Sequence, residues 1–291
     1  MTQPLSRRAF LCAATATAAF TTFPTVSGAA IPLTAKPVSS TDLRWLDGKP
    51  NAFEGGTLGV PWPRGTVKLG KGKTPEFKLG DVPVQSWPIA YWPDGSLKWT
   101  AHAVAGGAPT DGLSLTAGKA ATPGKAVSVK QTASEVTVTS GDLVWVVPTS
   151  GEYLIASATR AGRLTLKEAK LVALWQDQPD LDATGSIKQQ KFTSKVTKVT
   201  VEQTGPVRAV LKVEGTHSGN GRDWLPFSVR LYFYAGSESV RIVHSFIYDG
   251  DPAKDFIRGL GVTAKTPMTE ETHNRHIRLS GDGVGVWGEA V

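Results

Sequence analysis

The stretch from His273 to Arg278 is the chain's densest cluster of side chains that could bind or act on an anion. On a β-strand, Asn274, His276 and Arg278 would lie on one face, because successive side chains of a strand point to opposite sides. That face would offer amide and guanidinium donors together with one imidazole that titrates near neutral pH. The alternative is a solvated or salt-bridged strand edge, because charged groups are often structural.

Tryptophan is the second residue type of interest, with 9 copies in the chain. Trp62 lies in a Gly- and Pro-rich stretch at residues 55–65, and Trp92 lies in a second stretch at residues 85–100. Aromatic faces suit the C–H faces of pyranose rings, so Trp62 and Trp92 are predicted to form a sugar-stacking surface. Half-buried core tryptophans are the alternative interpretation.

Strands must position these residues, because almost every segment after residue 40 has strand character. Apolar and polar side chains alternate with the period of a half-buried strand at residues 195–201, 209–213, 227–234 and 239–247. The short segment between the last two runs suits a hairpin loop. Pro93-Asp94-Gly95-Ser96 is typical of a tight turn, because it combines a fixed φ, an Asx side chain and a glycine. The sequence therefore predicts an all-β protein.

Other chemistries find little support in the sequence. It contains no G-x-S-x-G elbow, no H-E-x-x-H zinc motif and no phosphate loop. His244 lies inside an apolar run and is predicted to be a hydrogen-bonded core histidine. Oxygen-rich loops can hold Ca²⁺, but the spacing of Asp177, Asp180 and Asp182 matches no calcium-loop pattern. A solvated loop is preferred there, and neither a metal nor a cofactor is predicted.

The N-terminus has the features of an export signal. Arg7 and Arg8 precede an apolar, Ala- and Thr-rich stretch, and small residues near position 29 suit cleavage. Residues 1–29 are therefore predicted to be a twin-arginine signal peptide that directs the chain to the periplasm or the extracellular space, with no other membrane segment. The single cysteine, Cys12, lies inside this signal, so the mature chain is predicted to have no disulfide.

The remaining charge is spread over the chain. The formal net charge is +7, of which the signal's two arginines supply a part. Because the lysines form no single basic run, nucleic acid is not predicted as a partner, whereas an acidic polysaccharide is compatible. A stretch rich in Gly, Ala, Thr and Pro at residues 106–125 predicts a domain boundary. We place the domains at residues 30–115 and 116–291.

Three stretches together resemble one family, the exo-rhamnogalacturonan lyases of the PcRGLX/YetA-like type. They are residues 55–65, residues 85–100, and the region from Trp224 to Trp287 that contains Tyr248-Asp249-Gly250. The first two resemble motifs of that family's N-terminal RIFT barrel, and the third resembles the first part of its central β-sandwich. The resemblance implies a small RIFT-type barrel followed by an incomplete antiparallel β-sandwich.

The resemblance also implies a reaction. Such a lyase acts on rhamnogalacturonan or a pectin-type acidic polysaccharide by β-elimination at galacturonate, which needs a base, an acid and a group that stabilises enolate-like charge. The Asn274, His276 and Arg278 side chains would suit a galacturonate carboxylate. The family continues into an α/α toroid, so we expect this chain to be an N-terminal fragment that is inactive alone, and no catalytic residue is assigned. The alternative is a non-catalytic carbohydrate-binding β-sandwich protein or an inactive remnant.

Overall fold

The computed structural model describes residues 40–290 apart from residues 46–49, 51, 70–72, 180–185 and 281–285. This part of the chain is built from strands, and its one helical segment is the 3₁₀ turn η1 (Thr272–Asn274). Within it, no helix is long and apolar enough to cross a membrane. The all-β prediction is therefore confirmed. The predicted signal peptide lies outside the described residues.

The N-terminal region forms two small antiparallel sheets, with strand orders β1-β6-β3 and β2-β5-β4. Their strands are β1 (Ser40–Asp42), β2 (Gly56–Pro61), β3 (Phe77–Lys78), β4 (Val84–Tyr91), β5 (Leu97–Val104) and β6 (Ser114–Ala117). Both sheets contribute to one apolar core, which includes Val60, Phe77, Leu97 and Leu115. This arrangement agrees with the small barrel that the resemblance implies.

The predicted turn between β4 and β5 is confirmed. The Trp92 N–H donates to the Ser96 carbonyl at 2.8 Å, and Asp94 Oδ1 accepts hydrogen bonds from the Ser96 amide and hydroxyl. These hydrogen bonds lower the pKa of Asp94 below its ordinary value. Gly95 has a φ of +78°, a conformation that costs glycine little because it lacks a Cβ. The Asp-Gly pair is therefore explained by turn geometry.

The C-terminal region is dominated by one antiparallel sheet with the order β15-β14-β13-β12-β11-β10-β9-β8-β7, and β16 pairs with β11. The strands are β7 (Val127–Gln131), β8 (Glu135–Ser140), β9 (Leu143–Pro148), β10 (Ile155–Arg160), β11 (Arg163–Gln176), β12 (Gln189–Thr204), β13 (Arg208–Gly219), β14 (Arg222–Tyr234), β15 (Val240–Phe246) and β16 (Phe256–Lys265). The hairpin predicted between residues 227–234 and 239–247 is confirmed, because Phe227 pairs with Phe246 and Phe233 with Val240.

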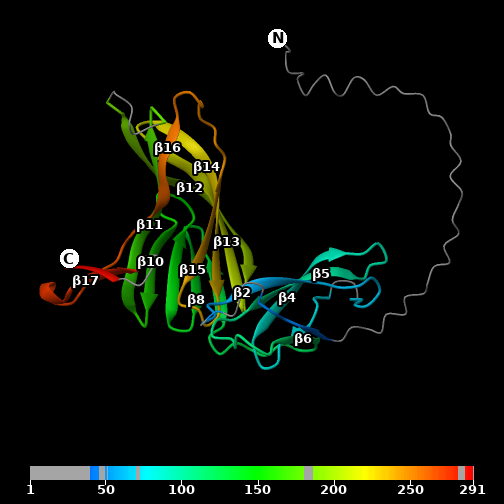
Figure 1. The fold of residues 1–291 in the computed structure, drawn as a ribbon. Helices are drawn as coiled ribbons and strands as arrows, with labels where there is room; N and C mark the ends of the chain where they lie inside the picture. The colour runs from blue at the N-terminus through cyan, green and yellow to red at the C-terminus, as the bar shows by residue number, and fades with distance from the viewer. Residues whose placement is uncertain are drawn as a thin grey trace, which may run out of the picture. The chain divides into compact units, whose positions relative to one another are not determined.

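Strand β11 divides this sheet into two layers (Figure 1). Lys167 in its first half pairs with Ser157 of β10, and Val172 in its second half pairs with Thr193 of β12. Strand β16 borders the opposite side of β11 from Lys167 to Gln176. Since β10 and β12 follow one another along the same side of β11, the strands beyond them belong to two different layers.

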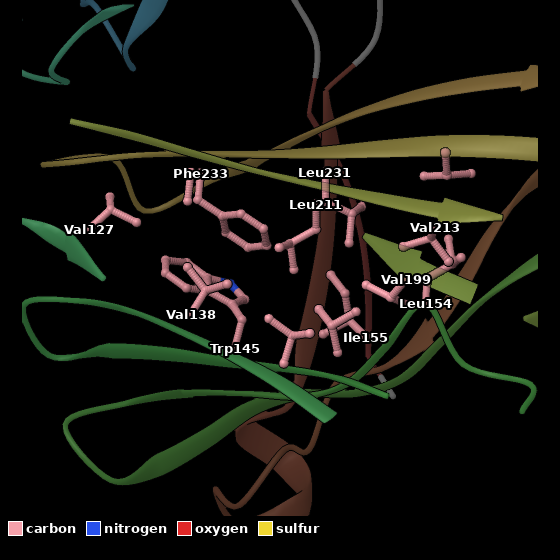
Figure 2. Packing of buried hydrophobic residues seen from close by; sticks show 14 of the residues in the cluster. Val127, Val138, Trp145, Leu154, Ile155, Val199, Leu211, Val213, Leu231 and Phe233 are labelled. Carbon is pink, nitrogen blue, oxygen red and sulfur yellow. The ribbon is translucent and has the colours of Figure 1, made fainter. Parts of the chain in front are cut away.

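The main core lies between these layers. Figure 2 shows Val138 and Trp145 of the β8–β9 layer facing Leu211 and Phe233 of the β13–β14 layer. The rings of Trp145 and Phe233 lie 5.2 Å apart between centroids. Val138 and Leu211 are fully buried, and burial of an aliphatic side chain of this size stabilises a fold by about 1.5–3 kcal/mol. The two layers thus form the predicted antiparallel sandwich.

The sandwich begins after the last barrel strand and is followed by a C-terminal pair of strands. Strand β6 stays in the barrel by pairing with β3 as far as Ala117, and β7 begins the sandwich at Val127. The change of domain therefore falls between these two residues, whereas the sequence prediction put it at residue 115. At the C-terminal end, β17 (His276–Ser280) pairs only with β18 (Val286–Ala290) among the described strands.

The barrel meets the sandwich through close backbone contacts. The Gly106 N–H donates to the Ala235 carbonyl at 2.7 Å, and a Cβ on Gly106 would lie only 2.9 Å from the carbonyl carbon of Gly236. Gln85 Oε1 accepts the backbone N–H groups of Val207 and Arg208, each at 3.0 Å. Thr57 Oγ1 of β2 lies 2.9 Å from Tyr234 Oη at the end of β14, so β2 of the barrel is close to the hairpin between β14 and β15.

Candidate functional site

The C-terminal cluster predicted from sequence is not a single strand face. Asn274 lies in η1, where its N–H donates to the Glu271 carbonyl at 2.8 Å, and the strand β17 begins only at His276. His276 and Arg278 alternate correctly along β17, but Asn274 precedes the strand and is wrongly placed on its face by the prediction. Asn274 and His276 are both exposed. The side chain of Arg278 lies outside the described residues.

The two predicted stacking tryptophans differ in environment. Trp62 is only 3% exposed, stacks on Phe77 at 5.1 Å and donates from Nε1 to Thr100 Oγ1 at 2.8 Å. Its ring is a core element, so the prediction of a sugar platform there is wrong. Trp92 is half-buried, donates to the Trp62 carbonyl at 3.0 Å, and has Lys98 Nζ 4.7 Å from its ring centroid.

Behind Trp62 lies a buried polar chain that includes His102. An indole N–H can only donate, so Thr100 Oγ1 accepts from Trp62 and its own hydroxyl proton is free to reach His102 Nε2 at 2.6 Å. His102 Nδ1 forms a hydrogen bond with Ser86 Oγ at 2.8 Å. Burial lowers the pKa of His102 to about 4. This imidazole is therefore neutral at physiological pH and organises the barrel core.

The most strongly hydrogen-bonded carboxylate is Asp255, next to the segment that joins β15 to β16. Arg222 donates to both of its oxygens at 2.7 and 2.8 Å, and Trp175 Nε1 donates to Oδ1 at 2.6 Å. The Asp251 N–H adds a bond at 2.8 Å. The hydrogen bonds from Arg222 are the main reason that the pKa of Asp255 lies far below its ordinary value. A carboxylate held this way is a poor base, so the cluster fixes the segment.

His217 and His244 lie on neighbouring inner-face positions of the sandwich, with ring centroids 5.5 Å apart. His217 Nδ1 donates to the Leu225 carbonyl at 2.8 Å, whereas its Nε2 has no hydrogen-bond partner among the described residues. His244 Nε2 is also buried without such a partner, so the prediction of a hydrogen-bonded core histidine is wrong for that atom. Burial lowers the pKa of both rings, that of His244 to about 4.

A cleft of about 960 Å³ opens beside β2. Gly56 and Gly59 of β2 line the cleft with their backbone. The side chains of Arg44, Trp45 and Arg241 also line it, and they could bind a ligand through charge or ring contacts. Trp45 is fixed by two contacts: its Nε1 donates to the Thr110 carbonyl at 2.9 Å, and its ring packs edge-on against Phe53 at 5.5 Å. The Trp45 side chain is nevertheless 41% exposed.

Sequence reasoning missed this cleft. Arg44 and Trp45 follow the short strand β1, and Arg241 lies far along the chain in β15, where it reads as an ordinary outward-facing residue. No local spacing links the two segments. The one available signal was an Arg-Trp pair in a region without strand alternation. Among the described residues, no group of three or more His, Cys, Asp or Glu side chains is arranged to hold a metal ion.

Comparison with known proteins defines the class of this two-domain fold. The PcRGLX-like N-terminal RIFT barrel domain matches residues 39–118, and the PcRGLX-like protein central beta sandwich domain matches residues 127–291. The chain therefore belongs to the PcRGLX-like family, which confirms the resemblance. It is also similar to the uncharacterized protein YetA of Bacillus subtilis (strain 168), with 33% identity over 244 residues. That alignment covers 82% of this chain and 28% of the relative's length.

Proposed function

We propose that the chain is part of an exported polysaccharide lyase that cleaves rhamnogalacturonan or a related pectin-type acidic polysaccharide by β-elimination at galacturonate. One observation carries the proposal: two successive domains of the PcRGLX-like family match in order along almost all of the chain after the predicted signal. The alignment with the YetA relative supports the same family but covers 28% of its length. The activity is accordingly proposed for the whole protein.

The reaction defines which groups are needed. Removal of the C5 proton, alpha to the carboxylate, requires a base, and departure of the 4-linked oxygen requires an acid. Cationic donors lower the cost of the enolate-like charge. Among the described residues, Arg44 and Arg241 of the cleft are the cationic donors that could stabilise this charge. His102 and His217 are not candidates for the base, because they are fully buried, and the Nε2 atom of the half-buried His244 is also buried.

The test is an elimination assay on the full chain. Proton abstraction and elimination create an unsaturated uronate that absorbs near ~235 nm, so the chain is incubated with rhamnogalacturonan backbone and absorbance is followed. A rise supports the lyase proposal, and His276→Ala is then the first variant to assay, because His276 is an exposed imidazole in the predicted C-terminal cluster. Folded chain that gives no rise, even when joined to the remainder of a full-length relative, contradicts it.

A second candidate function is non-catalytic binding of an acidic carbohydrate. It is favoured by the composition of the cleft, because the ionisable lining residues that the structure describes are Arg44, Asp111 and Arg241, with no histidine or lysine among them. Arginine stays protonated at any working pH, so it binds anions better than it transfers protons. Binding of rhamnogalacturonan oligosaccharides by the chain, with no absorbance change in the complete protein, would favour this function.

Export by the twin-arginine route is part of the proposal. Arg7 and Arg8 stand directly before the apolar stretch, as such signals require. Replacement of both by lysine is expected to retain the protein in the cytoplasm, whereas replacement of Lys36, outside the predicted signal, is not. Fractionation of cells that express each form distinguishes these outcomes, and unchanged export of the double variant contradicts the route.

A further inference from the structure

The cleft beside β2 combines a fixed aromatic face with two arginines that form no ion pair among the residues that the structure describes. Trp45 cannot swing away without losing its bond to the Thr110 carbonyl and its contact with Phe53. Its ring therefore presents a pre-set apolar surface at little further entropic cost on binding. A flat, partly exposed indole of this kind suits a ligand that has an apolar ring face.

The two arginines of the cleft differ from five other arginines of the described chain, which form ion pairs. Ion pairs to carboxylates are made by Arg64, Arg160, Arg163, Arg222 and Arg230. Neither Arg44 nor Arg241 pairs with a carboxylate among the described residues, although Arg241 lies 5.9 Å from the ring of Tyr232. A guanidinium fork that is not already paired can bind a carboxylate with two parallel hydrogen bonds.

The neighbouring hollow is lined by two carboxylates, whereas the described lining of the cleft has two arginines and one carboxylate, that of Asp111. It has a volume of about 500 Å³ and includes Glu54 and Glu238 in its lining. Glu238 pairs with Arg160 at 2.6 Å, and Glu54 accepts a bond from Ser237 at 3.2 Å, so both carboxylates are held in place. Like charges repel, so an anionic ligand is directed to the Arg44 and Arg241 side.

We propose that this cleft binds an acidic oligosaccharide, with a sugar ring stacked on Trp45 and uronate carboxylates bound by Arg44 and Arg241. Its volume of about 960 Å³ falls within the range of ligand sites, ~300–1,000 Å³. The anionic character follows from the two arginines and the ring character from Trp45. That the ring is a sugar rests on the proposed function. The described residues that line the cleft come from the barrel and the start of β15, and none of them belongs to η1 or β17.

Binding is tested by calorimetry on the full chain with a galacturonate trimer. The matched ligand is the same trimer with its carboxylates methyl-esterified, which keeps the rings and removes the charge. The acidic trimer is expected to bind at least about 10-fold more tightly, because charge-assisted hydrogen bonds are lost with the ester. Equal affinity for the two trimers, or no binding of either, overturns the proposal.

Variants locate the site. Arg44→Gln and Arg241→Gln are each expected to weaken trimer binding about 10-fold, and Trp45→Ala by a similar factor. Trp99→Ala and Lys130→Gln are the matched controls, because Trp99 is 40% exposed, nearly as much as Trp45, and Lys130 is an exposed cation elsewhere. The controls are expected to bind as the unmodified chain does. Loss of binding in the controls alone, or in all variants alike, overturns the assignment.

Two further measurements sharpen the result. Inorganic phosphate is added as a competitor, because a site for any small anion would bind phosphate as tightly as the trimer; that outcome overturns the sugar assignment. Near-ultraviolet circular dichroism of each variant shows whether the fold is kept. Binding by the chain, with no absorbance change even when the chain is joined to the remainder of a full-length relative, contradicts the lyase proposal only. An absorbance change without discrimination between the trimers contradicts the cleft proposal only.

Discussion

Two parts of the sandwich share the same strand pattern but differ in how their inner faces are covered. Where β8 and β9 face β13 and β14, inner side chains such as Val138, Leu211 and Leu231 are 0% exposed. On the edge strands the apolar side chains Ile242, Phe246, Leu260 and Val262 are 37–45% exposed. The first part is a closed core, and the second is an apolar face without a cover among the described residues.

Cross-strand pairing shows that the difference does not come from sequence patterning. Ile242 pairs with the buried Leu231 in β14, and Val262 pairs with the buried Leu171 in β11. Directly paired residues of an antiparallel ladder lie on the same face of the sheet. The edge residues therefore belong to the inner face. The alternation of a strand specifies which face is apolar, but the opposite layer decides whether that face is buried.

The largest expected effect tests this contrast at one paired position. Leu231→Ala is expected to lower the free energy of unfolding by about 2–5 kcal/mol, because it leaves a cavity in a closed core. Ile242→Ala, on the paired residue, is expected to cost less than about 1.5 kcal/mol, because its side chain is already partly in water. Urea denaturation of both variants gives the two values. Equal losses would mean that the edge is covered in solution.

The next effect concerns Asp255, which holds the segment between the two edge strands. Asp255→Asn is expected to lower the free energy of unfolding by about 2 kcal/mol, less than for a fully buried ion pair because Arg222 is itself 42% exposed. The pKa of Asp255 is lowered in the folded state, so its stabilising contribution is present above the unfolded value of about 4 and is lost as the pH falls.

The measurement for Asp255 is the free energy of unfolding at several pH values. Below pH ~4 the unfolded state binds a proton that the folded state does not, so the unmodified chain loses stability as pH falls. The Asn variant is expected to lack this part of the pH dependence. Parallel pH curves for the two proteins would show that Asp255 is not ion-paired in solution.

A smaller effect is expected from His244 at the uncovered face. Its pKa is lowered to about 4, below the unfolded value of about 6.5, so stability is expected to fall as the pH drops between these values. His244→Phe is expected to remove about 1–2 kcal/mol of that loss, because Phe does not titrate. Burial also lowers the pKa of His102 in the barrel to about 4. The His244→Phe variant keeps His102, so the pH dependence that remains in the variant includes the contribution of His102.

The smallest effect is predicted at Val262, which is more exposed than Ile242, Phe246 or Leu260 on the edge strands. Val262→Thr replaces one methyl group by a hydroxyl of similar size on a side chain that is 45% exposed. The free energy of unfolding is expected to change by no more than about 0.5 kcal/mol, and self-association is expected to decrease because the apolar edge becomes more polar. Denaturation and light scattering measure the two quantities. A loss above 1 kcal/mol would place Val262 in a covered core, against the contrast.

The parts of the fold that local sequence determines were predictable. The Asp94-Gly95 turn and the strands around it follow from neighbouring residues, and so does the hairpin between β14 and β15. Features that depend on distant or very short segments were not. Glu168 has a φ of +56° within β11, next to a shift of register between β11 and β16. No pattern of residues in the sequence predicts this irregularity. The turn at Thr272–Asn274 is too short to show helical periodicity.

The candidate site shows the same limit more sharply. Trp62 and Trp45 are equally aromatic in the sequence, yet one is 3% and the other 41% exposed, because only the first lies between the two barrel sheets. Arg44 and Arg241 come together through barrel-to-sandwich contacts such as Gly106 against Ala235, which no local spacing encodes. Residue types in the sequence led to the prediction of an acidic sugar ligand, whereas the proposed cleft could be located only from the tertiary structure.

The sharing of β11 by both layers has a consequence for synthesis on the ribosome. Strands β7 to β10 can pair with one another as they emerge, but one side of β11 gains its neighbour only when Lys265 and the rest of β16 have been made. Until β16 has been made, one edge of β11 is unpaired. An unpaired strand edge can form hydrogen bonds with strands of other nascent chains. Folding of this sandwich therefore cannot finish before β16 has been synthesised, and the time available for misassembly depends on the elongation rate.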